Sequence, residues 1–476
     1  MPYSALLTDL YELTMLAGYL REDMHEQQAA FDLFFREPPY LGSYAVFAGL
    51  APALDYLSHL KFSDADLAYL NSLNLFDAPF LEFLKTFRFR GRVTAPCEGE
   101  VVFAGEPLLT VEGTLAETQF VETALLNIIN FQTLVATKAA RLKIAAGPDS
   151  EVIEFGLRRA QGPDGGLSVA RAAAIGGVLS TSNVQAGQVF GLPVKGTHAH
   201  SWVMAFPDEL TAFRAYAECF PDSCVLLVDT YDTLTSGLPH ALIVAGELRE
   251  LGHEMLGVRL DSGDLAYLSR EARKRFDRAG FENVKIVASN ELDEHVIHSI
   301  RSEGGCIDIY GVGTRLATCA GPEGGALGGV YKLVESNGKP RLKTTSDPAK
   351  STLPSRKRWL RAVNPDGQFH MDVLDLQDHS GEPFRPGHIA FDPANPQRHK
   401  MVPLQCDLID CRHVVMDSGE VLSQAPSLEA LASYAAAQLS RLPEGTLRLI
   451  NPHRYKVGVS RRLLELRNRL QTAATS

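Results

Sequence analysis

The stretch Met255-Leu-Gly-Val-Arg-Leu-Asp-Ser-Gly-Asp-Leu265 places a short apolar run directly before a tight polar loop and the start of a helix pattern. Apolar residues then recur at Leu268, Ala272 and Phe276, a spacing typical of one face of an amphipathic helix. A second apolar run, Val284 to Ala288, follows that helix. A strand, a helix and another strand in this order predict parallel β/α construction.

Apolar runs of this kind recur along the middle of the chain. They are Val152 to Glu154, Leu192 to Val194, Val225 to Val228, Met255 to Leu260, Val284 to Ala288, Ile307 to Tyr310 and Val330 to Val334. Helix patterns separate several of them, and no glycine-rich dinucleotide fingerprint follows the first run. We therefore predict an irregular β/α barrel of about seven parallel strands, residues 144 to 334, rather than an open doubly wound sheet.

Polar side chains stand at the carboxyl ends of most of these runs, where β/α barrels gather their chemistry. In chain order they are Glu154 with Arg158 and Arg159, His198 with His200, Asp229, Arg259 with Asp261 and Asp264, Ser289 with Asn290, and Gly311 to Thr314. Each of them alone can be structural, because Asp or Asn after a strand often caps the next helix, as Asp264 and Asn290 could. Successive polar ends together predict one site at the mouth of the barrel.

The segment Lys195-Gly-Thr-His-Ala-His-Ser-Trp202 concentrates two histidines and two hydroxyl groups. A histidine can serve near neutral pH as a general base or a nucleophile, and an adjacent hydroxyl can orient its ring. Two histidines at this spacing also occur in surface loops and among hydrogen-bonded core histidines. The reactive residues at the neighbouring strand ends favour the functional interpretation.

Basic side chains and a glycine loop share the predicted mouth. They are Arg158, Arg159, Lys195, Arg259 and the loop Gly311 to Thr314. Backbone amides and guanidinium groups suit a substrate that carries phosphates or a carboxylate, although the glycine loop can also be an ordinary turn. The carboxylates of Asp229, Asp261 and Asp264 either hold Mg²⁺ through a substrate pyrophosphate or pair with the arginines, and the sequence leaves both interpretations open.

The segments that flank the barrel have a different character. Residues 1 to 143 mix helix patterns with short strands bounded by turn glycines, which predicts an α+β domain. Residues 335 to 476 form a C-terminal segment that we expect to pack partly with this N-terminal domain. At 476 residues the chain exceeds the size at which one core keeps growing, so a barrel with a companion domain is expected.

The bulk composition limits the classes of partner. The formal net charge is -11, from 46 basic and 57 acidic residues, and this ordinary balance argues against nucleic acid or an anionic membrane as the main partner. The 7 cysteines show neither CxxC pairs nor a zinc-like spacing, and no signal or transit peptide is predicted, so we expect reduced thiols in a cytoplasmic protein. The uncharged window Ala172 to Val194 is rich in Gly, Ser and Asn and does not predict a membrane span.

Six motifs follow one another from Leu7 to about Leu333. They are Leu7-Thr-Asp-Leu-Tyr-Glu-Leu-Thr-Met15, Glu154-Phe-Gly-Leu-Arg-Arg-Ala-Gln-Gly-Pro-Asp-Gly-Gly166, Gly196-Thr-His-Ala-His-Ser201, Gly257-Val-Arg-Leu-Asp-Ser-Gly-Asp-Leu265, Gly311-Val-Gly-Thr314 and Gly328-Gly-Val-Tyr-Lys-Leu333. Together they resemble the nicotinate phosphoribosyltransferase family. Beyond them, Lys343 to Arg358 has the basic, proline-punctuated character that the family shows there.

The resemblance implies a type II phosphoribosyltransferase of NAD salvage, in which nicotinate and phosphoribosyl pyrophosphate give nicotinate mononucleotide and pyrophosphate, driven by ATP hydrolysis with Mg²⁺. It implies a phosphohistidine at His200. We interpret His198 as a neighbour of this residue and not as a catalyst. The predicted catalytic residues are His200, Asp261 and Arg259. The predicted substrate contacts are Tyr11, Phe155, Arg158, Ser201, Asp229, Arg259, Gly313 and Thr314, and the predicted metal contacts are Asp261 and Asp264. Related enzymes are homodimers in which the tyrosine that matches Tyr11 reaches the partner's barrel mouth, opposite the aromatic residue that matches Phe155.

Other functions fit parts of the same pattern. Nicotinamide phosphoribosyltransferase shares the fold, but a carboxamide gains from an acidic partner, and the residue after Thr197 is a histidine. A decarboxylating relative that acts on quinolinate needs a denser basic cluster. A barrel lyase with a Schiff base on Lys195 or Lys285 is an alternative from another class, and so is a binding protein without catalysis.

Overall fold

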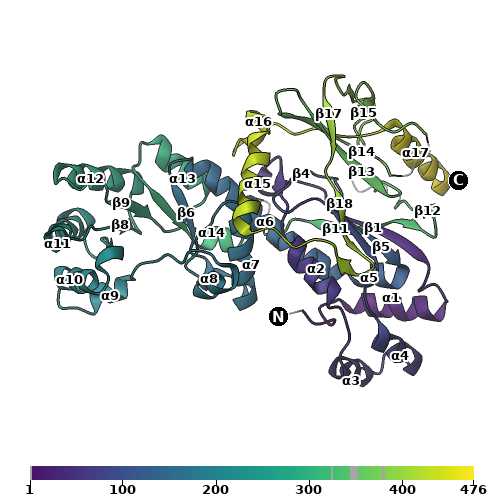
Figure 1. Ribbon diagram of the computed structural model, residues 1–476, viewed down its shortest axis with the longest axis horizontal. Helices are drawn as coiled ribbons and strands as arrows, with labels where there is room; N and C mark the ends of the chain where they lie inside the picture. Colours follow the sequence, from purple (N-terminus) through teal and green to yellow (C-terminus); the bar gives the residue numbers. More distant parts are fainter. Residues whose placement is uncertain (1–2, 323–324, 344–351, 378–380, 476) are drawn as a thin grey trace. The chain divides into compact units, whose positions relative to one another are not determined.

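The computed structural model describes residues 3–322, 325–343, 352–377 and 381–475. The chain divides into two compact units, and Figure 1 labels their elements where there is room. Unit 1 consists of Met1–Leu134, Ala326–Ser427 and Tyr434–Ser476. Unit 2 consists of Val135–Gly325 and Leu428–Ser433, so in the sequence it interrupts unit 1.

Unit 1 contains a seven-stranded sheet whose neighbouring strands are antiparallel. Its order is β12 (Lys339–Pro340), β11 (Gly329–Ser336), β1 (Gln28–Phe35), β5 (Leu109–Thr114), β3 (Arg92–Ala95), β18 (His413–Asp417) and β19 (Glu420–Val421). Strand β1 is buried over most of its length, as expected of a central strand. Helix α5 (Leu115–Phe120) packs on β1, and α1 (Leu10–Arg21) packs on α5.

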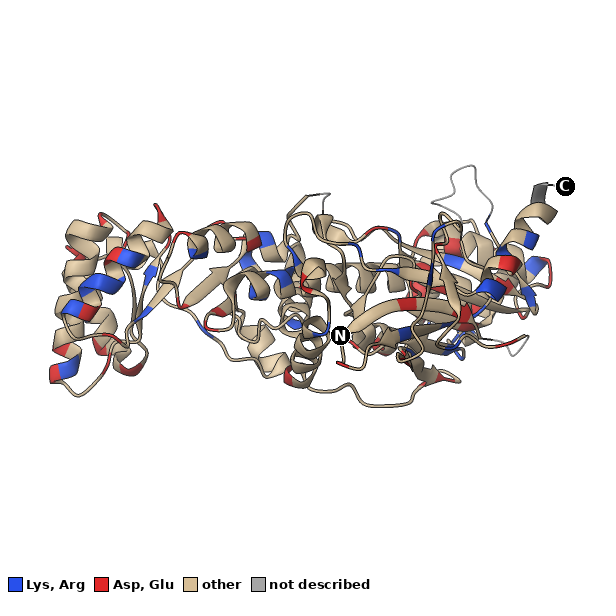
Figure 2. Cartoon of the chain, turned by 90° about the horizontal axis from the view of Figure 1, so that it is seen from above, with Lys and Arg blue, Asp and Glu red and all other residues tan. Residues whose placement is uncertain are grey.

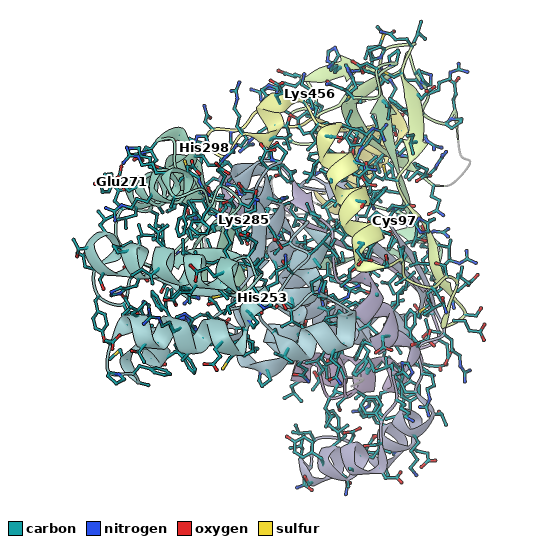
Figure 3. All side chains as sticks on the ribbon, turned by 60° about the vertical axis from the view of Figure 1, so that its left-hand side comes forward. Cys97, His253, Glu271, Lys285, His298 and Lys456 are labelled. Carbon is teal, nitrogen blue, oxygen red and sulfur yellow. The ribbon has the colours of Figure 1, made fainter. Side chains whose placement is uncertain are left out.

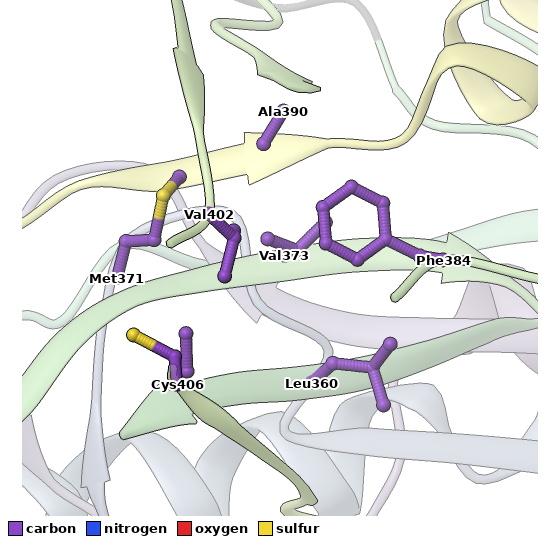
Figure 4. Close-up of a cluster of buried hydrophobic side chains, with 8 residues drawn as sticks. Leu360, Met371, Val373, Phe384, Ala390, Val402 and Cys406 are labelled. Carbon is purple, nitrogen blue, oxygen red and sulfur yellow. The ribbon is translucent and has the colours of Figure 1, made fainter. Parts of the chain in front are cut away.

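Unit 1 also contains a six-stranded sheet. Its order is β16 (His399–Met401), β15 (Ile389–Phe391), β20 (Val457–Val459), β14 (Phe369–Leu376), β13 (Lys357–Val363) and β17 (Asp407–Asp410). Figure 4 shows its apolar core, which consists of Leu360, Ala362, Met371, Val373, Phe384, Ala390, Val402 and Cys406. The side chain of Arg361 lies on the opposite face of β13, because successive residues of a strand point to opposite faces. It is buried there, with Nη2 at 2.8 Å from Asp372 Oδ2, and it also pairs with Glu100. Because each strand has two different faces, one sheet holds both an apolar core and a buried ion network.

Unit 2 is built on a five-stranded parallel sheet. Its order is β6 (Glu151–Glu154), β10 (Ile309–Val312), β9 (Lys285–Ala288), β8 (Gly257–Leu260) and β7 (Val225–Leu227). Helix α12 (Leu265–Arg278) connects β8 to β9 and packs against both. The parallel β/α unit that Met255 to Ala288 predicted is therefore confirmed.

Two of the predicted barrel strands differ in the structure. Val330 to Val334 is not a barrel strand: it lies in β11, antiparallel to β1 of unit 1, with Leu333 opposite Phe31. A short apolar run looks alike in parallel and antiparallel sheets, so periodicity alone could not assign it. In the run Leu192 to Val194, only Val194 takes part in β pairing, through a single parallel bridge to Thr181. Thr181 in turn forms a single parallel bridge to Glu154. The structure thus has a mixed α/β fold with a five-stranded parallel sheet, and continuous strands do not form the predicted seven-stranded barrel in the described residues.

A buried ion triad stabilises one side of unit 2. Glu294, in the first turn of α13 (Glu294–Ser302), lies 2.6 Å from Lys138 and 2.9 Å from Arg141, which both belong to α6 (Glu122–Ala146). Burial raises the pKa of Glu294, but the two cations lower it further, so that it lies below its ordinary value. A substitution of one member leaves the others charged and buried without full compensation, which is strongly destabilising.

Basic and acidic residues are interspersed along the chain in both units (Figure 2). Among the helices of the described residues, none combines the length and the apolar character that crossing a bilayer requires.

Candidate active site

Four strand ends of unit 2 surround a pocket of about 160 Å³. It is lined by Phe155, Arg158, Arg159, Arg259, Asp261, Ser289, Asn290, Glu291, Gly311, Gly313 and Thr314. These residues follow or end β6, β8, β9 and β10, which are parallel, so their carboxyl ends open on the same edge. The structure therefore brings six of the predicted site residues together: Phe155, Arg158, Arg259, Asp261, Gly313 and Thr314.

The turn after β6 carries Phe155 into this pocket. A Cβ atom on Gly311 would lie 2.4 Å from the Phe155 ring, so the ring can rest on β10 only because residue 311 is a glycine. The carboxylate of Glu154 is buried, and it accepts hydrogen bonds from the Gly156 amide and from Thr181 Oγ1. Burial raises the pKa of Glu154. This carboxylate fixes the turn that presents the aromatic ring.

Arg259 supplies a half-buried positive charge to the pocket. Its Nη2 donates a hydrogen bond to the His198 carbonyl oxygen at 3.1 Å, whereas its buried Nε has no partner among the described residues. Burial lowers the pKa of the Arg259 guanidinium, and the nearby carboxylates of Asp261 and Asp229 counteract that effect. A buried N–H without a partner is costly, so this side chain is suited to an anion that enters the pocket.

His200 reaches the pocket through Asp229. His200 Nε2 lies 3.3 Å from Asp229 Oδ1. The other oxygen of Asp229 accepts hydrogen bonds from the Asp261 amide at 3.0 Å and from Ser262 Oγ at 2.5 Å. Asp261 in turn accepts a hydrogen bond from Ser289 Oγ. Asp229 therefore joins the histidine to the loop that carries a pocket carboxylate, although neither His200 nor Asp229 lines the pocket itself.

His198 has a structural environment. Its Nε2 accepts a hydrogen bond from the Leu227 amide at 3.2 Å, which requires an unprotonated Nε2, and its ring packs edge-on against Tyr216. Burial lowers the pKa of His198 to about 4, so the ring is neutral at physiological pH. These contacts give His198 a hydrogen-bonding and packing role next to β7 and α10 (Glu209–Cys219).

The structure places two more predicted site residues outside the pocket lining. Asp264 is the N-cap of α12, where its Oδ1 accepts a hydrogen bond from the Tyr267 amide at 2.9 Å. Ser201 is exposed in the first turn of α9 (His200–Met204). Among the residues that the structure describes, no group of three or more His, Cys, Asp or Glu side chains is arranged to hold a metal ion by itself.

Both lysines considered for a Schiff base point away from the mouth. Lys285, which Figure 3 labels, is the first residue of β9 and lies 3.3 Å from Asp308. Lys195 was expected at the mouth, but its Nζ lies 2.6 Å from Glu151, the first residue of β6. Both amines therefore lie at the amino ends of parallel strands, opposite the pocket, because their carboxylate partners are there.

The sequence analysis did not single out Glu291, which also lines the pocket. Asn290 and Glu291 both have left-handed backbone conformations, with φ of 84° and 42°. Glu291 Oε1 accepts a hydrogen bond from Thr314 Oγ1 at 3.4 Å, and its Oε2 lies 3.5 Å from Arg315 Nε. The sequence signal for this turn is Asn290, because asparagine adopts a left-handed backbone conformation more readily than most residues.

Tyr11 belongs to unit 1 and is 45% exposed on α1. The next residue, Glu12, is fully buried, and its Oε2 accepts a hydrogen bond from Gln119 Nε2 at 2.9 Å. The same amide group donates to Glu122 at 3.2 Å, so two carboxylates share one donor. Burial raises the pKa of Glu12 to about 7, and the charge of Glu122 adds to this effect.

Glu12→Gln is expected to stabilise the protein at pH 8 by about 2 kcal/mol. The folded state keeps the Glu12 proton up to a pKa of about 7, whereas the unfolded chain loses it near the ordinary value of 4.5. Wild-type stability therefore falls as the pH rises from 4.5 to 7, and the glutamine variant lacks this decline. Urea unfolding at pH 5 and pH 8 measures this change in the free energy of unfolding, with a substitution of the exposed Glu22, Glu22→Gln, as control. Equal pH dependence in wild type and Glu12→Gln would contradict the assignment.

Family models match almost the whole chain. The N-terminal domain of nicotinate phosphoribosyltransferase (NAPRTase) matches residues 6–130, the NAPRTase family model matches residues 150–368, and the C-terminal domain matches residues 356–467. The nicotinate phosphoribosyltransferase of Bacillus subtilis (strain 168) is 43% identical over 466 residues, which cover 96% of this chain and 93% of the relative. That of Homo sapiens is 38% identical over 528 residues, with 98% and 96% covered.

Solved structures give the same result. The crystal structure of human nicotinic acid phosphoribosyltransferase is similar with a TM-score of 0.86 and 36% identity, over 97% of this chain and 99% of that chain. The nicotinate-nucleotide pyrophosphorylase from Pyrococcus furiosus shares the fold, with a TM-score of 0.70 at 22% identity over 92% of this chain and 95% of that chain. The resemblance inferred from the six motifs is thereby confirmed, and the chain belongs to the nicotinate phosphoribosyltransferase family.

Proposed function

We propose that this chain transfers the phosphoribosyl group of phosphoribosyl pyrophosphate to nicotinate, and thereby serves NAD salvage in the cytoplasm. The pyridine nitrogen bonds to the ribose carbon as the bond from that carbon to pyrophosphate breaks, which gives nicotinate mononucleotide and pyrophosphate. The names of the relatives support this reaction, and the pocket of unit 2 has the chemistry that it needs. The reacting groups must be held in line while water is excluded, which requires positioning more than acid–base catalysis.

The observation that carries the proposal is Arg259. Its guanidinium is half-buried, its Nε is buried without a partner among the described residues, and it lines the same pocket as the Phe155 ring. Nicotinate is a flat aromatic ring with a carboxylate, so it can stack on Phe155 while the carboxylate neutralises Arg259. Ser201 is proposed as a further contact to nicotinate. Nicotinamide has no charge and leaves the guanidinium uncompensated.

Other residues of the pocket suit phosphates. Gly313 and Thr314 begin α14 (Thr314–Ala317), and Arg158 and Arg159 face the same pocket. We propose that the glycine loop holds the phosphoribosyl phosphate and that the arginines hold the pyrophosphate. Glu291 must release Thr314 when a phosphate binds, because a carboxylate and a phosphate compete for the same hydroxyl.

Mg²⁺ fits this site only together with substrate. Asp261 and Glu291 are the two carboxylates that line the pocket among the described residues, which suits an ion that takes few protein ligands and completes its shell with phosphate and water oxygens. We propose that Asp261 supports it through the substrate pyrophosphate, with Asp264 as a second, more distant carboxylate. The ion would neutralise charge on the leaving pyrophosphate.

We propose that ATP phosphorylates His200. The imidazole nitrogen attacks the γ-phosphorus, ADP leaves, and later hydrolysis of the phosphohistidine releases phosphate. Asp229 supports this role because it can hold Nε2–H of His200 and leave Nδ1 as the nucleophile. The added negative charge would reorganise the cationic mouth in favour of productive binding.

We further propose that unit 2 closes into a seven-membered β/α barrel. The bridges from Glu154 to Thr181 and from Thr181 to Val194 continue the parallel sheet beyond β6. On the far side, Thr197 Oγ1 donates a hydrogen bond to the Val225 carbonyl oxygen, and the Leu227 amide donates to His198. The ring would consist of the five strands and the two segments that pair through single bridges. The hydrogen bonds of the Thr197 and His198 side chains to β7 would close it.

We propose a homodimer in which Tyr11 stacks on nicotinate in the partner's site. Tyr11→Ala is expected to weaken nicotinate binding about tenfold, because an aromatic stack contributes roughly 0.5–1.5 kcal/mol beyond burial, while the fold is retained. When Tyr11→Ala and His200→Ala subunits are co-assembled, part of the activity should return, since one of the two sites then has both residues. An absence of recovery in verified heterodimers would mean that Tyr11 does not act across the interface.

A product assay tests the main proposal. The purified chain is supplied with phosphoribosyl pyrophosphate, Mg²⁺ and either nicotinate or nicotinamide, each with and without ATP. Nicotinate mononucleotide should dominate, and ATP should stimulate its formation. Faster formation of nicotinamide mononucleotide, or no mononucleotide from either base, would reject the proposal.

A further inference from the structure

Unit 1 contains a second pocket of about 160 Å³, which shares no residue with the pocket of unit 2. Its walls are largely apolar and include Phe34, Ala104, Pro107, Leu353, Pro393 and Ala394. Its polar lining includes two arginines, Arg36 and Arg467, and one ion pair, Asp32 with Lys357. The pocket therefore combines an apolar body with a local excess of positive charge.

Arg467 is the unusual member of this lining. Its side chain is 8% exposed, and the hydrogen bond that it makes runs from Nη1 to the Pro393 carbonyl oxygen at 2.5 Å. Its Nε is buried without a partner, and within the described residues it forms no ion pair with a carboxylate. Charges that are buried in proteins are paired, because an unpaired ion loses its hydration without compensation. Within the described residues, Arg467 is thus a buried cation without an anionic partner.

The carboxylate of the pocket cannot supply this anion. Asp32 Oδ2 lies 2.7 Å from Lys357 Nζ, and Asp32 Oδ1 accepts a hydrogen bond from Thr110 Oγ1 at 2.6 Å. Both oxygens are therefore engaged, and the charge of Asp32 is balanced by Lys357. Arg36 also has no carboxylate partner within the part of the chain that the structure describes, and it lies over the Phe34 ring at 5.9 Å. The net charge around the pocket remains positive.

We propose that this pocket is a second ligand site, which binds a small monocyclic carboxylate or a similar organic monoanion with a compact ring. A cavity of about 150 Å³ with apolar walls accommodates a benzene ring, and this pocket has that size. The guanidinium of Arg467 can take the carboxylate with its free N–H, as a planar fork does in protein–carboxylate pairs. The pocket shares no residue with the pocket proposed to bind nicotinate, so its occupancy is a binding event additional to the proposed reaction.

Benzoate titration tests the site. Since benzoate also resembles nicotinate, the titrations are made in the Arg259→Leu background, which removes the cation of the pocket in unit 2. We expect one benzoate per chain by calorimetry, with Arg467→Met weakening binding at least tenfold and with the exposed Arg469→Met on the same helix leaving it unchanged. Inorganic phosphate should bind more weakly than benzoate, because it lacks the ring that the apolar walls accommodate.

Thermal unfolding of the ligand-free protein gives an independent measurement. Arg462, also on helix α17 (Arg461–Thr475), pairs with Asp375 at 2.6 Å, so Arg462→Met should lower the melting temperature. Arg467→Met should not lower it, because no carboxylate loses its partner. The proposal is overturned if Arg467→Met lowers the melting temperature as much as Arg462→Met does. It is also overturned if Arg467→Met leaves the benzoate affinity unchanged, or if phosphate binds more tightly than benzoate.

Discussion

His200→Ala is expected to abolish the ATP-stimulated part of turnover, with a fall of about 100-fold or more in the rate at saturating ATP. Weak transfer without ATP should persist, because the pocket proposed to hold nicotinate and phosphoribosyl pyrophosphate does not include His200. The physical reason is the contact of His200 Nε2 with Asp229 Oδ1 at 3.3 Å, which can orient the ring for attack on phosphorus. Initial rates with and without ATP, and acid-labile phosphate on the protein, measure the effect.

The control for this experiment is His253→Ala. His253 belongs to the same unit, is labelled in Figure 3, and pairs with Asp222 at 2.7 Å outside the pocket. This variant should keep full ATP stimulation and normal phosphate incorporation. Full ATP stimulation in His200→Ala would count decisively against the phosphohistidine at this position.

Arg259→Leu is expected to lower kcat/KM for nicotinate by about 100- to 1000-fold, the loss that follows when the partner of a buried carboxylate is removed. KM for phosphoribosyl pyrophosphate should change much less, because the proposed phosphate contacts, Thr314 and Arg158, remain. Arg259→Lys should recover only part of the activity, since an ammonium keeps the charge but lacks the planar fork. Steady-state kinetics with each substrate varied in turn measures both constants.

The ratio of nicotinate to nicotinamide turnover provides a sharper test of Arg259. If the guanidinium recognises a carboxylate, the leucine variant should lose most of its preference for nicotinate while keeping any slow reaction with nicotinamide. Equal losses with both bases would show that Arg259 supports the fold of the mouth and does not choose the substrate. Melting temperatures of the variants separate that outcome from general unfolding.

Local patterns could predict much of this site. The stretch around Arg259 predicts its strand, its polar loop and the following helix because a β/α unit is encoded within about 30 consecutive residues. The convergence of Phe155, Asp261 and Thr314 follows from the parallel arrangement alone, since parallel strands present their carboxyl ends on one edge. These predictions needed no knowledge of long-range contacts.

The features that sequence could not predict depend on partners far along the chain. Val330 to Val334 pairs with β1, about 300 residues earlier, and nothing in its apolar pattern identifies that neighbour. Lys195 pairs with Glu151 and therefore does not lie at the mouth. The sequence alone does not show which carboxylate a lysine will contact. The second pocket joins Phe34 to Pro393 and Arg467, which no motif connects.

The interruption of unit 1 by unit 2 has a consequence for biosynthesis. Strand β1 is complete early in translation, but its neighbour β11 emerges only after residues 135–325 have been made, which takes roughly 10–40 s at about 5–20 residues per second. During this interval the nascent chain carries Phe31, Leu33 and Phe35 on a strand with one unpaired edge. A truncation just before β11 would therefore leave the apolar edge of β1 unpaired, whereas unit 2 would lack only Leu428–Ser433.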